Sequence, residues 1–301
     1  MEQLPGAPPS DEEEFEHTRM TLREHLDELR SRMWKGTAAV LVCFVACYAV
    51  YEEIANALWQ PHYRAVEMLN QDLLEEVLLD VEAGEREAGE WLVVDMDPPE
   101  LLPHRSYQPN LQGTNPSESF VFALMTCLYV AIFVGSPILL WQIWGFVAAG
   151  LYDHERRAVT RYFPLSVGLF IGGVLFGYFV MMPYAMYFLG SVFDLVQVEN
   201  NYKVSEYASL LFSLCLALGI VFQLPVVILI FARLGLIEPQ DLSRYRGHFA
   251  VLAFIIAALL TPPDPVTQSL MAFPMIGLYE FGILLARAFG KPRETPTPGV
   301  A

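Results

Sequence analysis

The sequence predicts an all-α polytopic membrane protein with six transmembrane helices in a concave bundle. Of its 301 residues 54% are apolar and only 17% are charged, which is low for a soluble protein of this size. The apolar residues gather into blocks, and about 20 such residues suffice to cross a hydrocarbon core of roughly 30 Å. Prolines inside the blocks predict bent helices, which favour a curved bundle. The blocks cover residues 34–51, 119–143, 162–195, 207–233, 248–261 and 266–286.

The segment before the first block divides into two parts. Residues 1–18 are rich in proline, glutamate and aspartate and are expected to form a disordered acidic tail. Residues 19–33 are expected to form an amphipathic helix, because Thr21 and Glu24 have the spacing of a capping box. Its apolar stripe consists of Leu22, Leu26, Leu29 and Met33. We expect this helix to lie at the cytoplasmic membrane surface.

The membrane domain is expected to extend over residues 34–290, followed by a cytoplasmic tail at 291–301. Its first external loop, 52–117, holds 14 acidic and 3 basic residues and so carries most of the net charge of −16. This balance argues against anionic partners such as nucleic acid. The middle of the loop has enough Leu, Val and Trp to form a helix and a strand pair, so we expect an ordered cap.

The fifth span is unusually short. Residues 249–261 give only 13 helical positions, or about 20 Å at 1.5 Å per residue. The TPPDP sequence that follows cannot continue a helix, so Pro262, Pro263 and Asp264 are expected to form a fixed turn.

Basic residues predict the orientation of the chain. Of its 18 lysines and arginines, 14 lie before or at the start of the first span or after the second, fourth and sixth spans. Because basic loops stay in the cytoplasm, both termini are expected there, and six spans satisfy this parity.

Two acidic residues on the cytoplasmic side are the first candidates for function. Glu28 lies in HLDELRSR, and Glu155 lies in the loop LYDHERR between the second and third spans. Carboxylates bind guanidinium groups in a bidentate manner, so the pair predicts a receptor for a cationic ligand. The structural alternative is an i,i+4 ion pair between Glu28 and Arg32, and a salt bridge from Glu155 to its neighbouring arginines.

Polar residues inside the spans are the second set of candidates. Gln223 and Glu280 lie in the fourth and sixth spans, where polar groups need partners and an ionisable group indicates function. Glu280 is equally compatible with pairing to a cytoplasmic arginine. The alternative function is therefore a small-solute or ion transporter with both residues along its path.

Catalysis and metal binding are not indicated by any motif. The sequence lacks HExxH, GxSxG and a phosphate-binding glycine loop, so we expect neither a catalytic residue nor a cofactor. The four cysteines lie in apolar blocks without metal-ligand spacing, and no metal site is expected.

Four motifs, taken together, resemble the TatC family, the receptor core of twin-arginine protein translocation. They are HLDELRSR at 25–32, NPSESF at 115–120, QIWGFVAAGLYDHERR at 142–157 and LLTPPDPVTQSLMAFPMIGLYEFG at 259–282. The resemblance covers nearly all of residues 20–290. It implies a glove-like bundle of six helices in the bacterial inner membrane, with both ends in the cytoplasm.

The resemblance also implies a function and a site. The cytoplasmic face would bind the twin-arginine signal peptide of a folded precursor, with Glu28 and Glu155 contacting the arginine pair. Phe146, Leu26 and Arg32 would line this site. The implied partners are single-span subunits of the TatA and TatB types and further copies of the chain, and the proton-motive force would drive export.

Two positions and one loop depart from the family pattern. Gln223 stands where the family commonly has a glutamate, so a permanent charge is not required there. Asn115 replaces the serine that usually begins the second motif. The first external loop is longer and more acidic than is typical, so its fold does not follow from the resemblance.

Overall fold

The computed structural model describes residues 22–93, 100–101, 106–107, 116–151, 153–195, 203–261 and 264–290. Helices make up almost all of this part of the chain, which confirms the predicted all-α class. The two expected tails, 1–18 and 291–301, lie outside the described residues, as do Pro262 and Pro263.

The predicted membrane spans correspond to helices in the described chain. Five segments are long and apolar enough to cross a membrane. They are Arg23–Ala49, Ser117–Val134, Thr160–Val192, Val204–Arg233 and Pro265–Phe289. The predicted fifth span is the shorter apolar helix α13 (Arg246–Leu260), whose 15 residues extend over about 22 Å.

The first helix joins two segments that the sequence pattern predicted to be separate helices. We expected residues 19–33 to lie along the membrane surface before a span at 34–51. Instead α2 (Leu22–Ala49) is one helix of 28 residues that continues from the amphipathic part into the span without a break. The charged residues near its start are therefore held at a fixed rotation relative to the apolar part.

Three spans are divided into consecutive helical pieces. The second span consists of α6 (Pro116–Val134) and α7 (Ser136–Ala149), and the fourth of α10 (Val204–Val221) and α11 (Leu224–Arg233). Pro137 and Pro225 lie in the first turns of α7 and α11, where the missing N–H costs no helical hydrogen bond. The third span contains a π-helical turn. Its pieces are α8 (Asp153–Phe176), η1 (Gly177–Met181) and α9 (Met182–Leu195).

The sixth span, α14 (Pro265–Phe289), keeps Pro274 in its interior. A short helix, α12 (Pro239–Arg244), connects α11 to α13. Asp264 is the N-cap of α14, since its Oδ1 accepts a hydrogen bond of 2.7 Å from the backbone N–H of Thr267. This contact satisfies a backbone N–H in the first turn of α14.

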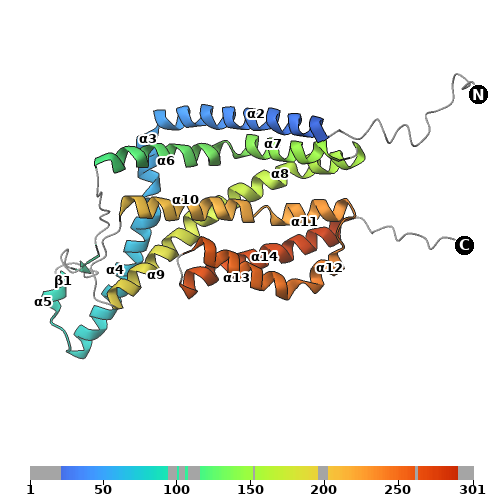
Figure 1. Ribbon diagram of the computed structural model, residues 1–301. Coiled ribbons are helices and arrows are strands. Elements are labelled where there is room, and N and C mark those ends of the chain that lie inside the picture. The colour runs from blue at the N-terminus through green and yellow to red at the C-terminus, as the bar shows by residue number, and fades with distance from the viewer. Residues whose placement is uncertain are drawn as a thin grey trace, which may run out of the picture.

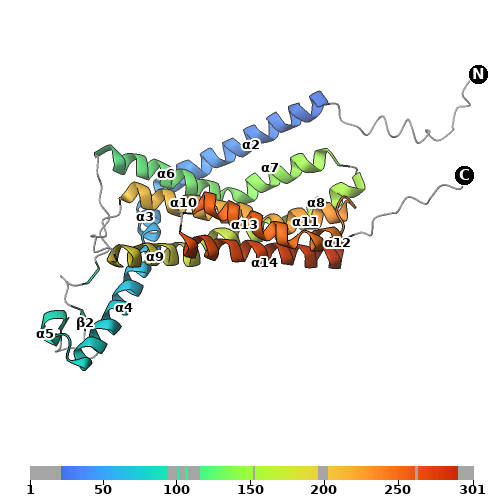
Figure 2. The same cartoon turned by 60° about the horizontal axis from the view of Figure 1, so that its bottom comes forward.

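The described part of the loop 52–117 forms a cap that projects beyond the bundle (Figures 1 and 2). Its helices and strands are α3 (Tyr51–Leu58), α4 (Gln60–Ala83), α5 (Ala88–Trp91), β1 (Leu92–Val93) and β2 (Glu100–Leu101). The strands pair antiparallel, with Leu92 opposite Leu101. The helix and strand pair expected from the sequence are therefore present.

Two tyrosines of the bundle hold the corner between α3 and α4. Pro61 has no N–H, so the carbonyl of Ala57 lacks its usual helical donor, and the hydroxyl of Tyr178 donates to it instead. The hydroxyl of Tyr207 donates to the carbonyl of Leu58 at 2.7 Å. Farther along α4, the guanidinium of Arg64 lies 5.3 Å from the centroid of the Phe179 ring. The cap is thus fixed to the third and fourth spans.

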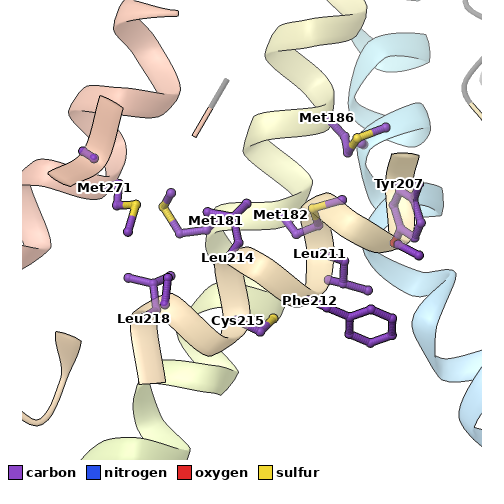
Figure 3. Packing of buried hydrophobic residues seen from close by; sticks show 14 of the residues in the cluster. Met181, Met182, Met186, Tyr207, Leu211, Phe212, Leu214, Cys215, Leu218 and Met271 are labelled. Carbon is purple, nitrogen blue, oxygen red and sulfur yellow. The ribbon is translucent and has the colours of Figure 1, made fainter. Parts of the chain in front are cut away.

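The main core lies where η1 and α9 pack against α10 and α14 (Figure 3). Met181, Leu214, Leu218 and Met271 all have a relative exposure of 0%. Methionine is flexible enough to fill the irregular space beside a π-helical turn. Because lipid offers little hydrophobic drive for helix association, close packing of this kind supplies much of the stability.

One end of the bundle collects the segments expected in the cytoplasm. Figures 1 and 2 both place the start of α2, the connection between α7 and α8, α12 and the end of α14 at the end opposite the cap. The fold therefore brings the helices that carry Glu28 and Glu155 to the same end of the molecule.

Candidate functional site

Glu28 and Arg32 form an ion pair on α2. The Nε of Arg32 donates to Oε1 of Glu28 at 2.7 Å, and its Nη2 lies 2.6 Å from the same oxygen. The i,i+4 pair that the sequence offered as the structural alternative is therefore present. Both contacts are to Oε1, and the Glu28 side chain keeps a relative exposure of 34%. A carboxylate has about four acceptor positions, so this pairing does not saturate it.

Phe146 of α7 faces the start of α2. Its ring stacks on the imidazole of His25, with centroids 4.4 Å apart and an interplanar angle of 26°. His25 also lies close to Gly150, where an added Cβ would be 3.6 Å from its Cε1. These contacts hold α7 against the first turns of α2, the part of the helix that carries Glu28.

An apolar groove of about 460 Å³ opens between α2 and the second span. Arg32 and Phe146 line one part of it, and Val40 and Ile132 line another. The α2 residues that line it extend from Leu29 to Val40, which is about 16 Å along the helix axis. The full lining is Leu29, Arg32, Met33, Gly36, Thr37, Val40, Ile132, Leu139, Gln142, Ile143 and Phe146.

Leu26 is placed differently from the other predicted site residues. It has a relative exposure of 55% and does not contribute to the groove lining. The structure thus brings Glu28, Arg32 and Phe146 together and leaves Leu26 on an outer face of α2.

Glu155 lies in the first turn of α8, and its side chain is outside the described part of the structure. The α8 backbone follows directly on the connection from α7, at the same end as the start of α2 (Figure 1). The next residue, Arg156, is exposed to solvent.

Sequence reasoning missed the role of Gly145. A Cβ built on Gly145 would lie 2.7 Å from Cζ of Arg32, so the guanidinium rests against the α7 backbone. Nothing in the sequence links positions 32 and 145, because their contact depends on how α2 and α7 are rotated. His25 was missed for the same reason, since its stacking on Phe146 is visible only in three dimensions.

Gln223 belongs to a small polar network inside the bundle. Its Nε2 donates to the backbone carbonyl of Ser166 at 2.9 Å, and its Oε1 accepts from the Ser166 hydroxyl. The indole N–H of Trp144 donates to the same hydroxyl at 2.8 Å. Gln223 thus links the second, third and fourth spans, in line with the packing role expected of a buried glutamine.

Glu280 pairs with an arginine, as the sequence allowed. Its Oε2 lies 2.9 Å from Nη2 of Arg246, the first residue of α13. The relative exposures are 39% for Glu280 and 49% for Arg246. Neighbouring contacts also join α14 to α12, since Tyr279 donates to the Leu242 carbonyl and Arg287 to the Ser243 hydroxyl.

Within the described residues, no group of three or more His, Cys, Asp or Glu side chains is arranged to hold a metal ion.

A family comparison decides what kind of membrane protein this is. The sequence model of one protein family, described as Sec-independent protein translocase protein (TatC), matches residues 24–274, which is most of the chain. The chain belongs to the TatC family. It is therefore a component of a protein translocase with several membrane-spanning helices, and the resemblance found in the sequence is confirmed.

Individual members of the TatC family match over long stretches. The TatC protein of Desulforapulum autotrophicum is 33% identical over 281 residues, covering 93% of this chain and 89% of its own length. The TatC protein of Halothiobacillus neapolitanus is 34% identical over 269 residues, covering 89% of this chain and 63% of its own length.

The fold is also that of a solved TatC. A crystal structure of the twin-arginine translocase receptor TatC in DDM matches with a TM-score of 0.65 and 29% sequence identity. The match covers 87% of this chain and 99% of the crystallised one. It supports the predicted fold class across the membrane domain.

Proposed function

We propose that this chain is the receptor core of a twin-arginine translocation system. Its cytoplasmic face would bind the signal peptides of folded precursor proteins for export. The observation that carries the proposal is the position of Glu28. Its carboxylate is one-third exposed, lies at the arginine-rich end of the bundle, and adjoins an apolar groove.

The shape of this region suits a signal peptide. A signal peptide joins a basic segment to an apolar segment of 7–15 residues. Glu28 and Glu155 supply acids for the basic segment. The α2 side of the groove runs from Leu29 to Val40, which is 11 residues farther along the helix and close to the length of an apolar segment.

The topology and partners follow from the same proposal. The position of 14 of the 18 basic residues on one side of the predicted spans supports cytoplasmic termini in a bacterial inner membrane. Single-span subunits of the TatA and TatB types, further copies of this chain and the proton-motive force would complete the machinery. The chain would act as a receptor and not as an enzyme.

The transporter alternative loses support from the described contacts. Gln223 is engaged by Ser166, and Glu280 is engaged by Arg246. Both polar residues that would have lined a solute path therefore have structural partners.

Site-specific photocrosslinking tests the proposal. A photoreactive residue at position 28 or 155 in the full chain should crosslink to a twin-arginine precursor in membranes. The same probe at position 75, an exposed acid of the cap, serves as the control. Crosslinks that form equally from position 75, or that persist when both arginines of the precursor become lysines, would count against the proposal.

A further inference from the structure

Gly145 leaves a space in α7 that the end of the Arg32 side chain fills. A Cβ on Gly145 would lie 2.7 Å from Cζ of Arg32 and closer still to Nη1. Contacts under 3.0 Å are essentially never made by real Cβ atoms. The guanidinium therefore occupies a place that only glycine allows, which we call the Arg32 seat.

The seated guanidinium also holds Glu28. Nε and Nη2 both contact Oε1 of Glu28, at 2.7 and 2.6 Å. The Arg32 side chain has a relative exposure of 17%, against 34% for Glu28. Arg32 thus connects the rigid backbone of α7 to a carboxylate that is more open to solvent.

We infer that Arg32 is a positioning residue for Glu28 and that Gly145 is required for that role. This inference rests on the proposed function. The seat holds the carboxylate in one conformation and leaves Oε2 for an incoming guanidinium. Ordering a flexible side chain upon binding costs about 0.5–1.5 kcal/mol, so a carboxylate ordered in advance raises affinity about twofold to tenfold.

The charge of Arg32 opposes this effect, since it repels a second guanidinium. The repulsion is weakened because Glu28 is partly exposed and charges near water are screened. The two effects are separable by mutation. Gly145→Ala keeps the charge of Arg32 and removes its seat, whereas Arg32→Ala removes both.

Gly145→Ala is a mild substitution for the fold. The displaced atoms are the far end of a flexible side chain, so Arg32 can move while α7 stays in place. Alanine is also the better helix former. Gly172→Ala in α8 is the matched control, because a Cβ there meets nothing within 4 Å.

The test measures the affinity of the full-length chain in lipid nanodiscs for a fluorescent twin-arginine signal peptide. Gly145→Ala and Arg32→Ala should each weaken binding about twofold to tenfold. The double variant should bind no more weakly than Arg32→Ala alone, because the seat has no role without its occupant. Gly172→Ala should bind like the wild type.

A second readout observes the seat without the peptide. In nitrogen-15 NMR spectra, the Nε–H of Arg32 should be protected from exchange, and its signal is assigned by its absence in Arg32→Ala. Both Gly145→Ala and Glu28→Ala should lose this protection. A protected signal in Gly145→Ala would show that the seat is unnecessary and would overturn the inference.

The binding outcomes separate the inference from the proposed function. If Glu28→Ala abolishes binding while Gly145→Ala binds like the wild type or more tightly, the inference alone is overturned. If the losses of affinity in Gly145→Ala and Arg32→Ala multiply in the double variant, the inference is also overturned. If Glu28→Ala binds like the wild type, the proposed function fails, and the positioning role fails with it.

Discussion

The hydroxyl of Tyr207 in α10 donates a hydrogen bond to the backbone carbonyl of Leu58, at 2.7 Å and with Tyr207 2% exposed. One side chain of the fourth span therefore satisfies a backbone carbonyl at the corner between α3 and α4, where the chain enters the cap.

Tyr207→Phe should loosen this corner. It removes the donor to the buried carbonyl of Leu58, and an unsatisfied buried group costs about 1–3 kcal/mol. We expect a lower thermal unfolding midpoint in detergent and faster proteolysis within α3 and α4. Tyr184→Phe, at an exposed position, is the control and should unfold like the wild type. Equal midpoints for all three proteins would contradict the anchoring role.

The stability of the cap should depend on pH through His62. This side chain is 3% exposed, and its burial lowers the pKa to about 4, against 6.5 for an unperturbed histidine. Above pH 6.5 both the folded and unfolded states hold neutral imidazole, so His62 adds no pH dependence. Between pH 6.5 and 4 only the unfolded state gains the proton, and folding loses up to about 3 kcal/mol.

Thermal unfolding of the wild type and of His62→Gln from pH 8 to pH 4 measures this contribution. The wild type should lose more stability than the variant as the pH falls from 6.5 to 4, and the two curves should run parallel above pH 6.5. Curves that stay parallel throughout would show that His62 accepts a proton equally well in both states.

The sequence predicted the fold class well because the membrane imposes long apolar blocks, and these are visible without a structure. For Glu280 it left pairing with an arginine and a direct functional role equally open, and for Glu28 it gave the i,i+4 pair with Arg32 as the structural alternative. Both pairs are present in the structure. The sequence did not predict that α2 continues through residue 33 into the span. A surface helix and the start of a span have the same amphipathic pattern.

Contacts between segments that lie far apart in the sequence could not be predicted from it. The place of Arg32 against Gly145 depends on the rotation of α2 relative to α7, which no local pattern determines. The same holds for Tyr178, whose hydroxyl reaches Ala57 from the π-helical turn of the third span.

Gln223 should stabilise the fold as a neutral side chain, and the fold should not need a negative charge at this position. Gln223→Leu removes the contacts to Ser166, and hydrogen bonds between membrane helices average about 0.6 kcal/mol, with a maximum near 1.7. Gln223→Glu should be more destabilising at pH 8 than at pH 5, because an ionised carboxylate would face the Ser166 carbonyl. Thermal unfolding of both variants at the two pH values tests this, and a Glu variant that is stabilised at pH 8 would contradict it.

The Glu280–Arg246 pair should matter little for folding. Both side chains are about 40–50% exposed, and such pairs are worth about 0–1 kcal/mol. Glu280→Gln should therefore lower the unfolding midpoint only slightly, and the difference should shrink in 0.5 M salt because screening removes it. A large loss that is insensitive to salt would instead indicate a buried role for Glu280.

The most direct test of the receptor proposal is the affinity of the full-length chain for a twin-arginine signal peptide when one acid at a time is neutralised. Glu28→Gln and Glu155→Gln should each weaken binding by about tenfold or more, equivalent to about 1.4 kcal/mol. Glu75→Gln, in the cap at the opposite end, should leave affinity unchanged. Binding that is equally tight in all four proteins would contradict the account.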